Sequence, residues 1–188
     1  MKIAISARLQ SVTTAFACVG LLAATAMSHA QNGAHSHGAI RMEVALEAGS
    51  LTVRLDAPLD SLLGFEHRPR TDSQRRAADA LLTRMRNASA VVVPSAAAQC
   101  SVKDVVVEAE VLAPASSAGL QHPAQDKHAD LEATYTFACL QPEKLQALEL
   151  GLFAAFPRLQ RIDARVVSSR TQTAFTLRRP QQVLRLGK

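Results

Sequence analysis

The stretch that decides the fold is IRMEVALEAGSLTVRL, residues 40–55. The apolar Ile40, Met42 and Val44 alternate with charged or small residues, which is the period of a half-buried strand. The small residues 48–50 supply a turn, and the same alternation resumes in 51–55. The pattern predicts a β-hairpin with one face in the core.

The segment before the hairpin is typical of a secretory signal peptide. It begins with the basic residues Lys2 and Arg8, continues with an uncharged and largely apolar run over 9–27, and ends in Ser28-His29-Ala30. Polar residues within the run make a membrane anchor the weaker alternative. We therefore expect residues 1–30 to be a cleaved signal peptide and 31–188 to be the exported chain.

The length of 31–188 favours one globular domain, because a chain of this length can bury a sizeable core. The signal segment holds two of the 21 basic residues and none of the 16 acidic ones, which leaves a mild net charge of +3. The arginines are spread along the chain without interleaved aromatic residues, a pattern that argues against nucleic-acid binding.

Two cysteines remain after cleavage, Cys100 and Cys139. An even pair in an oxidising compartment predicts a disulfide bond. The alternative is a two-thiolate metal site, which would require both cysteines to stay reduced outside the cytosol.

Helix signals follow the hairpin. Pro58 starts a short apolar turn that Gly64 ends, and Thr71 with Gln74 fits a capping box at the start of a long helix that Pro94 ends. A second helix is predicted over 142–156. Further strands are predicted over 100–112, 131–140, 162–166 and 173–177, with an exposed loop over 113–130.

The predicted order is ββ-α-ββ-α-ββ. This order indicates an α+β fold, in which an antiparallel β-sheet carries two main helices packed on one face.

Five histidines of the exported chain are the candidate metal ligands, because zinc takes four ligands that include imidazole nitrogen and carboxylate oxygen. His35 and His37 would point the same way in an extended segment. His67 is equally consistent with a backbone hydrogen bond. Imidazole also suits copper and nickel, so residue type does not fix the metal. The remaining candidates are His122, His128 and Asp130, with Glu66 as the weakest.

No motif marks a catalytic site. The sequence lacks G-x-S-x-G, H-E-x-x-H and a phosphate-binding glycine loop, so we expect binding and no enzymatic activity. A zinc hydrolase would need a general base, for which Glu66 is the one candidate. The main alternative is an envelope protein-interaction or scaffold module in which the histidines are incidental.

Four motifs follow one another in the chain: AHSHG (34–38), LDSLLGFEHRPRTDSQ (59–74), HADLEATYTFAC (128–139) and GLFAAFPRLQRIDARVV (151–167). This run resembles the DUF2796 family of Gram-negative periplasmic proteins, whose members include zinc-regulated, zinc-binding proteins of the ZrgA type. The resemblance covers nearly the whole of 31–188.

The resemblance implies a periplasmic zinc-binding protein, an accessory or chaperone in zinc acquisition that supports an ABC-type zinc importer and its solute-binding component. It implies no membrane span after signal cleavage. By motif, His35 and His37 match the N-terminal histidine cluster, and His67 matches the histidine of the GFEH motif. His122 and His128 fall in the histidine-bearing loop, and Cys100 and Cys139 match the cysteine pair. Family loops are often crowded with histidines, whereas 120–130 holds two, which favours a single defined zinc site.

Overall fold

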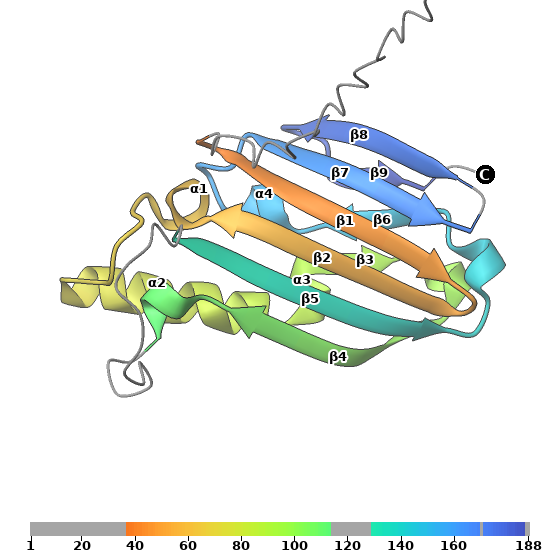
Figure 1. Ribbon diagram of the computed structural model, residues 1–188, viewed down its shortest axis with the longest axis horizontal. Helices are drawn as coiled ribbons and strands as arrows, with labels where there is room; N and C mark the ends of the chain where they lie inside the picture. The colour runs from red at the N-terminus through yellow and green to blue at the C-terminus, as the bar shows by residue number, and fades with distance from the viewer. Residues whose placement is uncertain (1–36, 114–128, 170, 187–188) are drawn as a thin grey trace, which may run out of the picture. The chain divides into compact units, whose positions relative to one another are not determined.

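The computed structural model of the chain describes residues 37–113, 129–169 and 171–186 (Figure 1). The predicted signal peptide lies outside these residues. The helical elements are α1 (Leu59–Leu63), α2 (Asp72–Met85), α3 (Ala88–Val91), α4 (Leu152–Ala155) and the 3-10 turns η1 (Ala96–Ala98), η2 (Glu110–Leu112) and η3 (Pro142–Lys144). The strands are β1 (Ala39–Glu47), β2 (Ser50–Pro58), β3 (Val92–Pro94), β4 (Cys100–Glu108), β5 (Asp130–Cys139), β6 (Ala147–Leu150), β7 (Arg161–Ser168), β8 (Gln172–Arg178) and β9 (Val183–Arg185).

The main sheet has six strands in the order β4-β5-β2-β1-β7-β8 (Figure 1). The α+β class is confirmed, but the expectation of a purely antiparallel sheet is wrong, because β1 and β7 are parallel. The chain reaches β7 only after it has passed through the second layer of the domain, and it therefore enters beside β1 in the same direction.

The predicted hairpin is β1 and β2. Val44 pairs with Val53, and the connection is the two-residue turn between Glu47 and Ser50. Gly49 has a φ of 89°, a conformation that a side chain disfavours and that short hairpin turns require. Met42, Val44 and Val53 are all within 1 % of complete burial, so the alternation read from the sequence does direct one face into the core.

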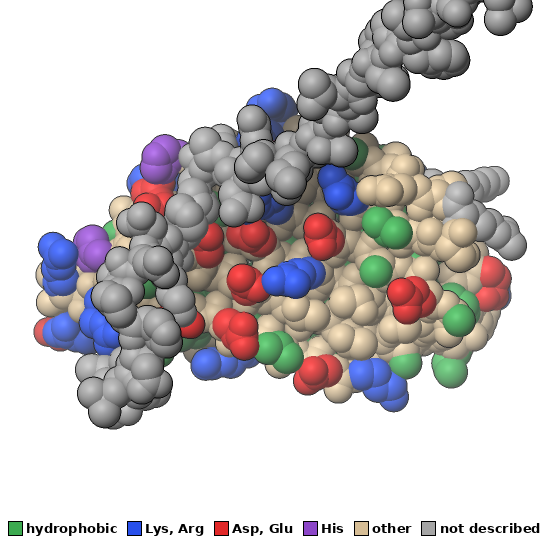
Figure 2. Space-filling view, in the orientation of Figure 1, with side chains coloured by type: hydrophobic (Ala, Val, Ile, Leu, Met, Phe, Trp, Pro, Cys, Tyr) green, Lys and Arg blue, Asp and Glu red, His purple; other side chains and the backbone are tan. Residues whose placement is uncertain are grey.

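The opposite face of the six-stranded sheet is open to solvent and carries charged and small polar side chains (Figure 2). Cross-strand ion pairs join Arg41 to Asp56 at 3.1 Å and Arg54 to Glu132 at 2.6 Å. Such exposed pairs contribute little to stability, typically about 0.2–1 kcal/mol each. The ion pairs do determine which face of the sheet is exposed to solvent, because a register slip of one residue would bury these charges.

The second layer covers the apolar face with the helices and a three-stranded sheet of order β3-β6-β9 (Figure 1). Leu148 and Leu150 of β6 are completely buried, as are Leu59 of α1 and Leu159 before β7. Among the described residues, no helix is long and apolar enough to cross a membrane.

The first predicted helix is confirmed at its start and corrected at its end. The Thr71 hydroxyl accepts from the backbone N–H of Gln74 at 3.2 Å, and the Gln74 side chain accepts from the N–H of Thr71 at 3.4 Å, which completes the capping box. The helix ends at Met85 and not at Pro94, because Asn87 takes an extended conformation. The residues up to Pro94 form α3 and β3.

The predicted second helix over 142–156 is wrong. This segment forms η3, β6 and the single turn α4. At Gly151, a side chain would overlap the carbonyl oxygen of Ala90, and the Gly151 N–H donates to the carbonyl of Val91 at 3.0 Å. The chain is therefore pressed against α3 at a point where a regular helix surface would not fit.

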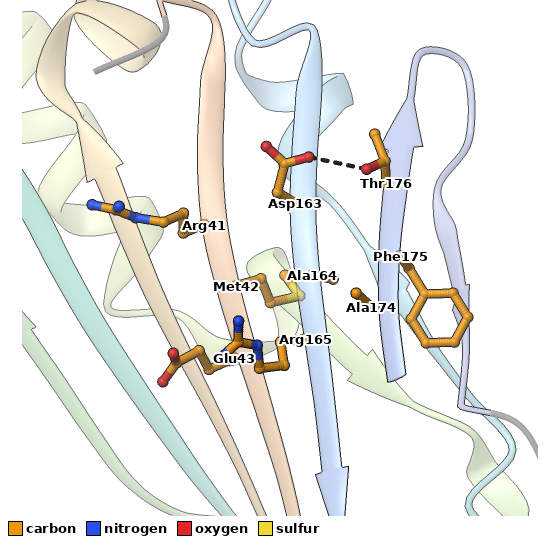
Figure 3. A pocket seen from close by; sticks show the side chains of 9 residues that line it. All are labelled: Arg41, Met42, Glu43, Asp163, Ala164, Arg165, Ala174, Phe175 and Thr176. Atoms are coloured by element: carbon orange, nitrogen blue, oxygen red, sulfur yellow. Dashed lines mark hydrogen bonds between the residues drawn. The ribbon is translucent and has the colours of Figure 1, made fainter. Parts of the chain in front are cut away.

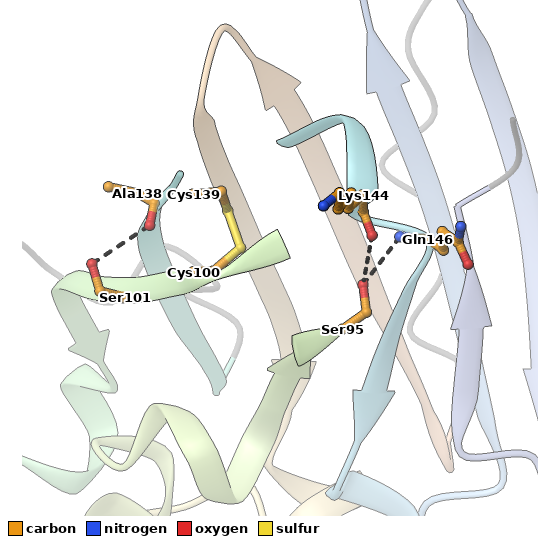
Figure 4. The surroundings of a disulfide bond; sticks show 7 residues. All are labelled: Ser95, Cys100, Ser101, Ala138, Cys139, Lys144 and Gln146. Atoms are coloured by element: carbon orange, nitrogen blue, oxygen red, sulfur yellow. Dashed lines mark hydrogen bonds between the residues drawn. A yellow bond between two sulfur atoms is a disulfide. The ribbon is translucent and has the colours of Figure 1, made fainter. Parts of the chain in front are cut away.

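Cys100 and Cys139 form the predicted disulfide, and they lie directly opposite each other where β4 begins and β5 ends (Figure 4). Their sequence separation of 39 corresponds to about 3–4 kcal/mol of stabilisation in the chain-entropy model. Because both sulfurs are consumed in this bond, the alternative of a two-thiolate metal site is excluded. The nearby Ser95 hydroxyl accepts from the N–H of Gln146 at 3.1 Å, which ties the end of β3 to the start of β6 within the second layer.

Tyr135 joins β5 to the end of α2 in the core. Its side chain is completely buried, and its hydroxyl donates to the carbonyl oxygen of Met85 at 2.7 Å. The last carbonyls of a helix have no partner within the helix, so this bond satisfies one of them. Burial raises the pKa of the Tyr135 hydroxyl well above its ordinary value, which keeps the hydroxyl protonated as a donor.

We expect Tyr135→Phe to lower the free energy of unfolding by about 1–3 kcal/mol, because the Met85 carbonyl is left without a partner in the core. Urea denaturation followed by circular dichroism measures the loss. Thr134→Val, on the open face of the same strand, is the control and should change stability by much less. Equal midpoints for the Phe variant and the unaltered protein would show that the hydrogen bond contributes nothing.

Candidate metal site at the α1 end of the sheet

The short helix α1 occupies one end of the six-stranded sheet. It begins directly after β2, and Gly64 ends it with a φ of 82°. Leu59 and Leu62 bury their side chains in the core, which holds the helix against the sheet. Its exposed side therefore has a fixed position relative to the strands that start or end nearby.

Ser61 connects α1 to the start of β1. Its side chain is completely buried, and its hydroxyl accepts from the N–H of Gly38 at 3.0 Å and donates to the carbonyl of Ala39 at 3.3 Å. The carbonyl of Gly38 in turn accepts from the N–H groups of Gln160 and Arg161 at 2.7 and 3.0 Å. These bonds fix the backbone immediately after His37.

His37 lies against the exposed side of α1. Its Nδ1–H donates to Oδ2 of Asp60 at 2.9 Å, while the other carboxylate oxygen of Asp60 lies 3.5 Å from the Arg158 guanidinium. Arg158 also donates to the carbonyl of Asp60 at 3.2 Å. The His37 side chain is 78 % exposed and that of Asp60 is 20 % exposed. A carboxylate on Nδ1 favours the tautomer that leaves the Nε2 lone pair free for a metal ion.

His67 lies four residues beyond the end of α1. Its Nδ1–H donates to the carbonyl oxygen of Arg68 at 2.9 Å, and its ring stacks on Phe65 with 5.3 Å between the ring centroids. The expected backbone hydrogen bond is therefore present. This hydrogen bond does not compete with metal ligation, because it uses Nδ1 and leaves Nε2 available to an ion. Figure 2 shows the two described histidines at the same end of the molecule.

Both ends of the predicted loop 113–130 are held at this same end of the sheet. Before the loop, the Arg68 side chain donates to the carbonyl of Ala113 at 3.0 Å. After it, the backbone N–H of Leu59, the first residue of α1, donates to the carbonyl of Ala129 at 2.9 Å. Asp130 then starts β5 opposite Pro58.

The structure thus places four of the predicted ligands, His37, His67, Glu66 and Asp130, in or beside the segments that meet at α1. His35, His122 and His128 lie outside the described residues. Within the described residues, no group of three or more His, Cys, Asp or Glu side chains lies close enough together to hold a metal ion. A tetrahedral zinc site here would need donors from outside them.

Asp60 is the residue that sequence reasoning missed. It is 23 positions from His37 and lies in an apolar turn that looked purely structural. No local pattern reports this pairing, because it depends on the Ser61 contacts that bring the start of β1 onto α1.

A depression lies on the open face over β1, β7 and β8, with a volume of about 260 Å³ (Figure 3). One of its two lining carboxylates, Asp163, already has partners. Asp163 accepts from the Thr176 hydroxyl at 3.1 Å and lies 2.9 Å from the Arg161 side chain. No histidine lines it.

A search of the curated proteins finds no match for this chain. The family model described as the ZrgA family zinc uptake protein matches residues 34–186. The matched region contains α1, the disulfide, the sites of all five candidate histidines and all nine strands named above. The chain therefore belongs to the ZrgA family of zinc uptake proteins.

Proposed function

We propose that this protein binds a zinc ion in the periplasm and acts as an accessory or chaperone in zinc acquisition. The observation that carries the proposal is the meeting of three histidine-bearing segments at α1. His37 bonds to Asp60 of α1, His67 follows α1, and the loop that carries His122 and His128 begins and ends on residues bonded to this region.

The proposed ligands are imidazole nitrogens with one carboxylate, a donor set that suits tetrahedral zinc. His37 and His67 would both bind through Nε2, because Nδ1 is already engaged in each. His35 is two residues from His37 and His128 is adjacent in sequence to Ala129. Both therefore lie close in sequence to a residue that is hydrogen-bonded to α1. His122, Asp130 and, more weakly, Glu66 complete the set from which the remaining ligands come.

Asp60 has a supporting role in this proposal. A carboxylate bonded to the far nitrogen of a zinc-binding histidine orients the ring and raises its basicity. Arg158 holds the Asp60 carboxylate from the other side and balances its charge. The unit His37–Asp60–Arg158 would therefore present one preoriented ligand before the ion arrives.

The accessory role follows from the character of the site. One histidine is strongly exposed and the proposed donors come from separate segments, so an ion would be reached and released without unfolding the core. We propose that the protein supports an ABC-type zinc importer by exchanging zinc with its solute-binding component. We propose binding without catalysis, in line with the absence of a catalytic motif from the sequence.

Isothermal titration of protein purified from the periplasm tests zinc binding. We expect one ion per chain with a dissociation constant below roughly 10 μM. His37→Ala and His67→Ala should each weaken binding, whereas Ser36→Ala, which removes no imidazole, should not. Affinity should fall below about pH 6.5, where protons compete for imidazole. Absence of binding at 10 μM would end the proposal, and equal affinities for the His67 and Ser36 variants would remove His67 from the ligands.

Asp60→Asn should weaken zinc binding about tenfold, because a neutral amide supports the His37 imidazole less well than a carboxylate. Nitrogen-15 spectra of the histidine rings should also show a smaller share of the Nδ1–H tautomer at His37 in zinc-free protein. Asp56→Asn, which breaks the 3.1 Å ion pair with Arg41 on the open face, is the matched control. An unchanged tautomer and affinity in the Asp60 variant would show that this carboxylate only packs against its neighbours.

The scaffold alternative predicts a different result in cells. If the histidines are incidental, a variant lacking all five should still support growth on scarce zinc. We expect that variant to grow as poorly as a strain without the protein, while remaining folded by circular dichroism. Normal growth of a folded five-histidine variant would favour the scaffold role.

A further inference from the structure

In the part of the chain that the structure describes, the two sheets have four edge strands, and three of these strands carry features that disfavour pairing with another chain. β4 contains a bulge between Val102 and Asp104 with Lys103 at its centre. β3 and β9 are three residues long, and β3 ends in Pro94. Bulges, charges, prolines and short strands are the usual devices that stop an edge from pairing with another chain.

The fourth edge, β8, has none of these devices. It is a regular strand of seven residues, QTAFTLR, paired on one side with β7 without a register shift. Within the described residues, no backbone group of 172–177 bonds to anything on its other side. Its one charged residue, Arg178, stands at the very end.

The sequence of β8 is complementary to itself in the antiparallel direction. The midpoint of the seven residues is Phe175, so a two-fold axis at Phe175 is the one register that pairs all seven. Phe175 would face its own copy, and Thr173 would face Leu177. On the open face, Ala174 would face Thr176 and Gln172 would face Arg178.

The central pair of aromatic side chains is a favourable one, and no pair sets like charges opposite each other. Aromatic pairs across strands are among the stabilising ones, whereas like charges opposite each other destabilise. Phe175 is only partly buried and packs at the margin of the core, where it is also one of the residues that line the depression (Figure 3). A second Phe175 would cover its remaining exposed surface and extend the core across the interface.

We propose that β8 is a homodimer interface, through which two copies join their six-stranded sheets edge to edge into one continuous sheet of twelve strands. The two α1 ends then lie at opposite corners of the dimer, because antiparallel pairing points the two β8 strands in opposite directions. The proposed zinc sites therefore stay accessible, and this inference does not depend on zinc binding.

The first test uses the unaltered protein. Sedimentation velocity over a range of concentrations should show a twofold rise in mass, and hydrogen exchange should show β8 amides gaining protection as the dimer forms. Amides of β4, the opposite edge, should not change. A monomer at every concentration would overturn the proposal, as would a dimer that leaves β8 unprotected. If the true partner of β8 is a strand from another protein, the purified chain should stay a monomer at every concentration.

The second test fixes the register. Directly opposite residues of antiparallel strands have Cα atoms about 4.5–5.5 Å apart, within the reach of a disulfide. Phe175→Cys should therefore form a covalent dimer on mild oxidation. Thr173→Cys, on the same face, should not, because the two copies of residue 173 are four residues apart along the strands, about 13 Å. Equal cross-linking of the two variants would contradict this register, and mass spectrometry should confirm that Cys100–Cys139 is intact in both.

Discussion

The buried hydroxyl of Ser61 makes the contact on which the candidate metal site at α1 depends. Among the described residues, Ser61 is fully buried, as is the Tyr135 hydroxyl, and a buried hydroxyl without partners would be costly. The Ser61 hydroxyl is satisfied by the backbone of Gly38 and Ala39, and this requirement ties α1 to the start of β1. The His37–Asp60 contact follows from that tie.

Much of the large sheet could be predicted because its strands are long enough to show their period. The hairpin, the capping box at Thr71 and the strand that ends at Cys139 are all local patterns with a physical cause. The second layer could not be predicted in the same way. β3 and β9 have three residues each, and Leu145, Leu148 and Leu152 imitate helical spacing although Leu148 and Leu150 alternate in β6. The parallel pairing of β1 with β7 is set by the packing of that layer.

The same distinction, between local patterns and contacts of distant residues, applies to the candidate site. The histidines were predictable because imidazole is rare and chemically distinctive. The placement of the described His37 beside α1 was not predictable, because it rests on contacts between residues far apart in sequence, such as Asp60 with Arg158 and Ser61 with Gly38. The disulfide was predictable as a pair, because two cysteines remain in an oxidising compartment, and the structure adds that the pair joins the start of β4 to the end of β5.

Hydrogen bonds fix the backbone at Ala113 and at Ala129. The stability of the domain should therefore depend little on the length of the segment between these two residues. When both ends of a loop are fixed on one rigid body, doubling its length costs only about 0.6 kcal/mol of closure entropy. Insertions and histidine-rich expansions between these two residues are therefore nearly neutral for folding. The length of this segment can therefore change in evolution while every strand of the scaffold stays under its own constraint.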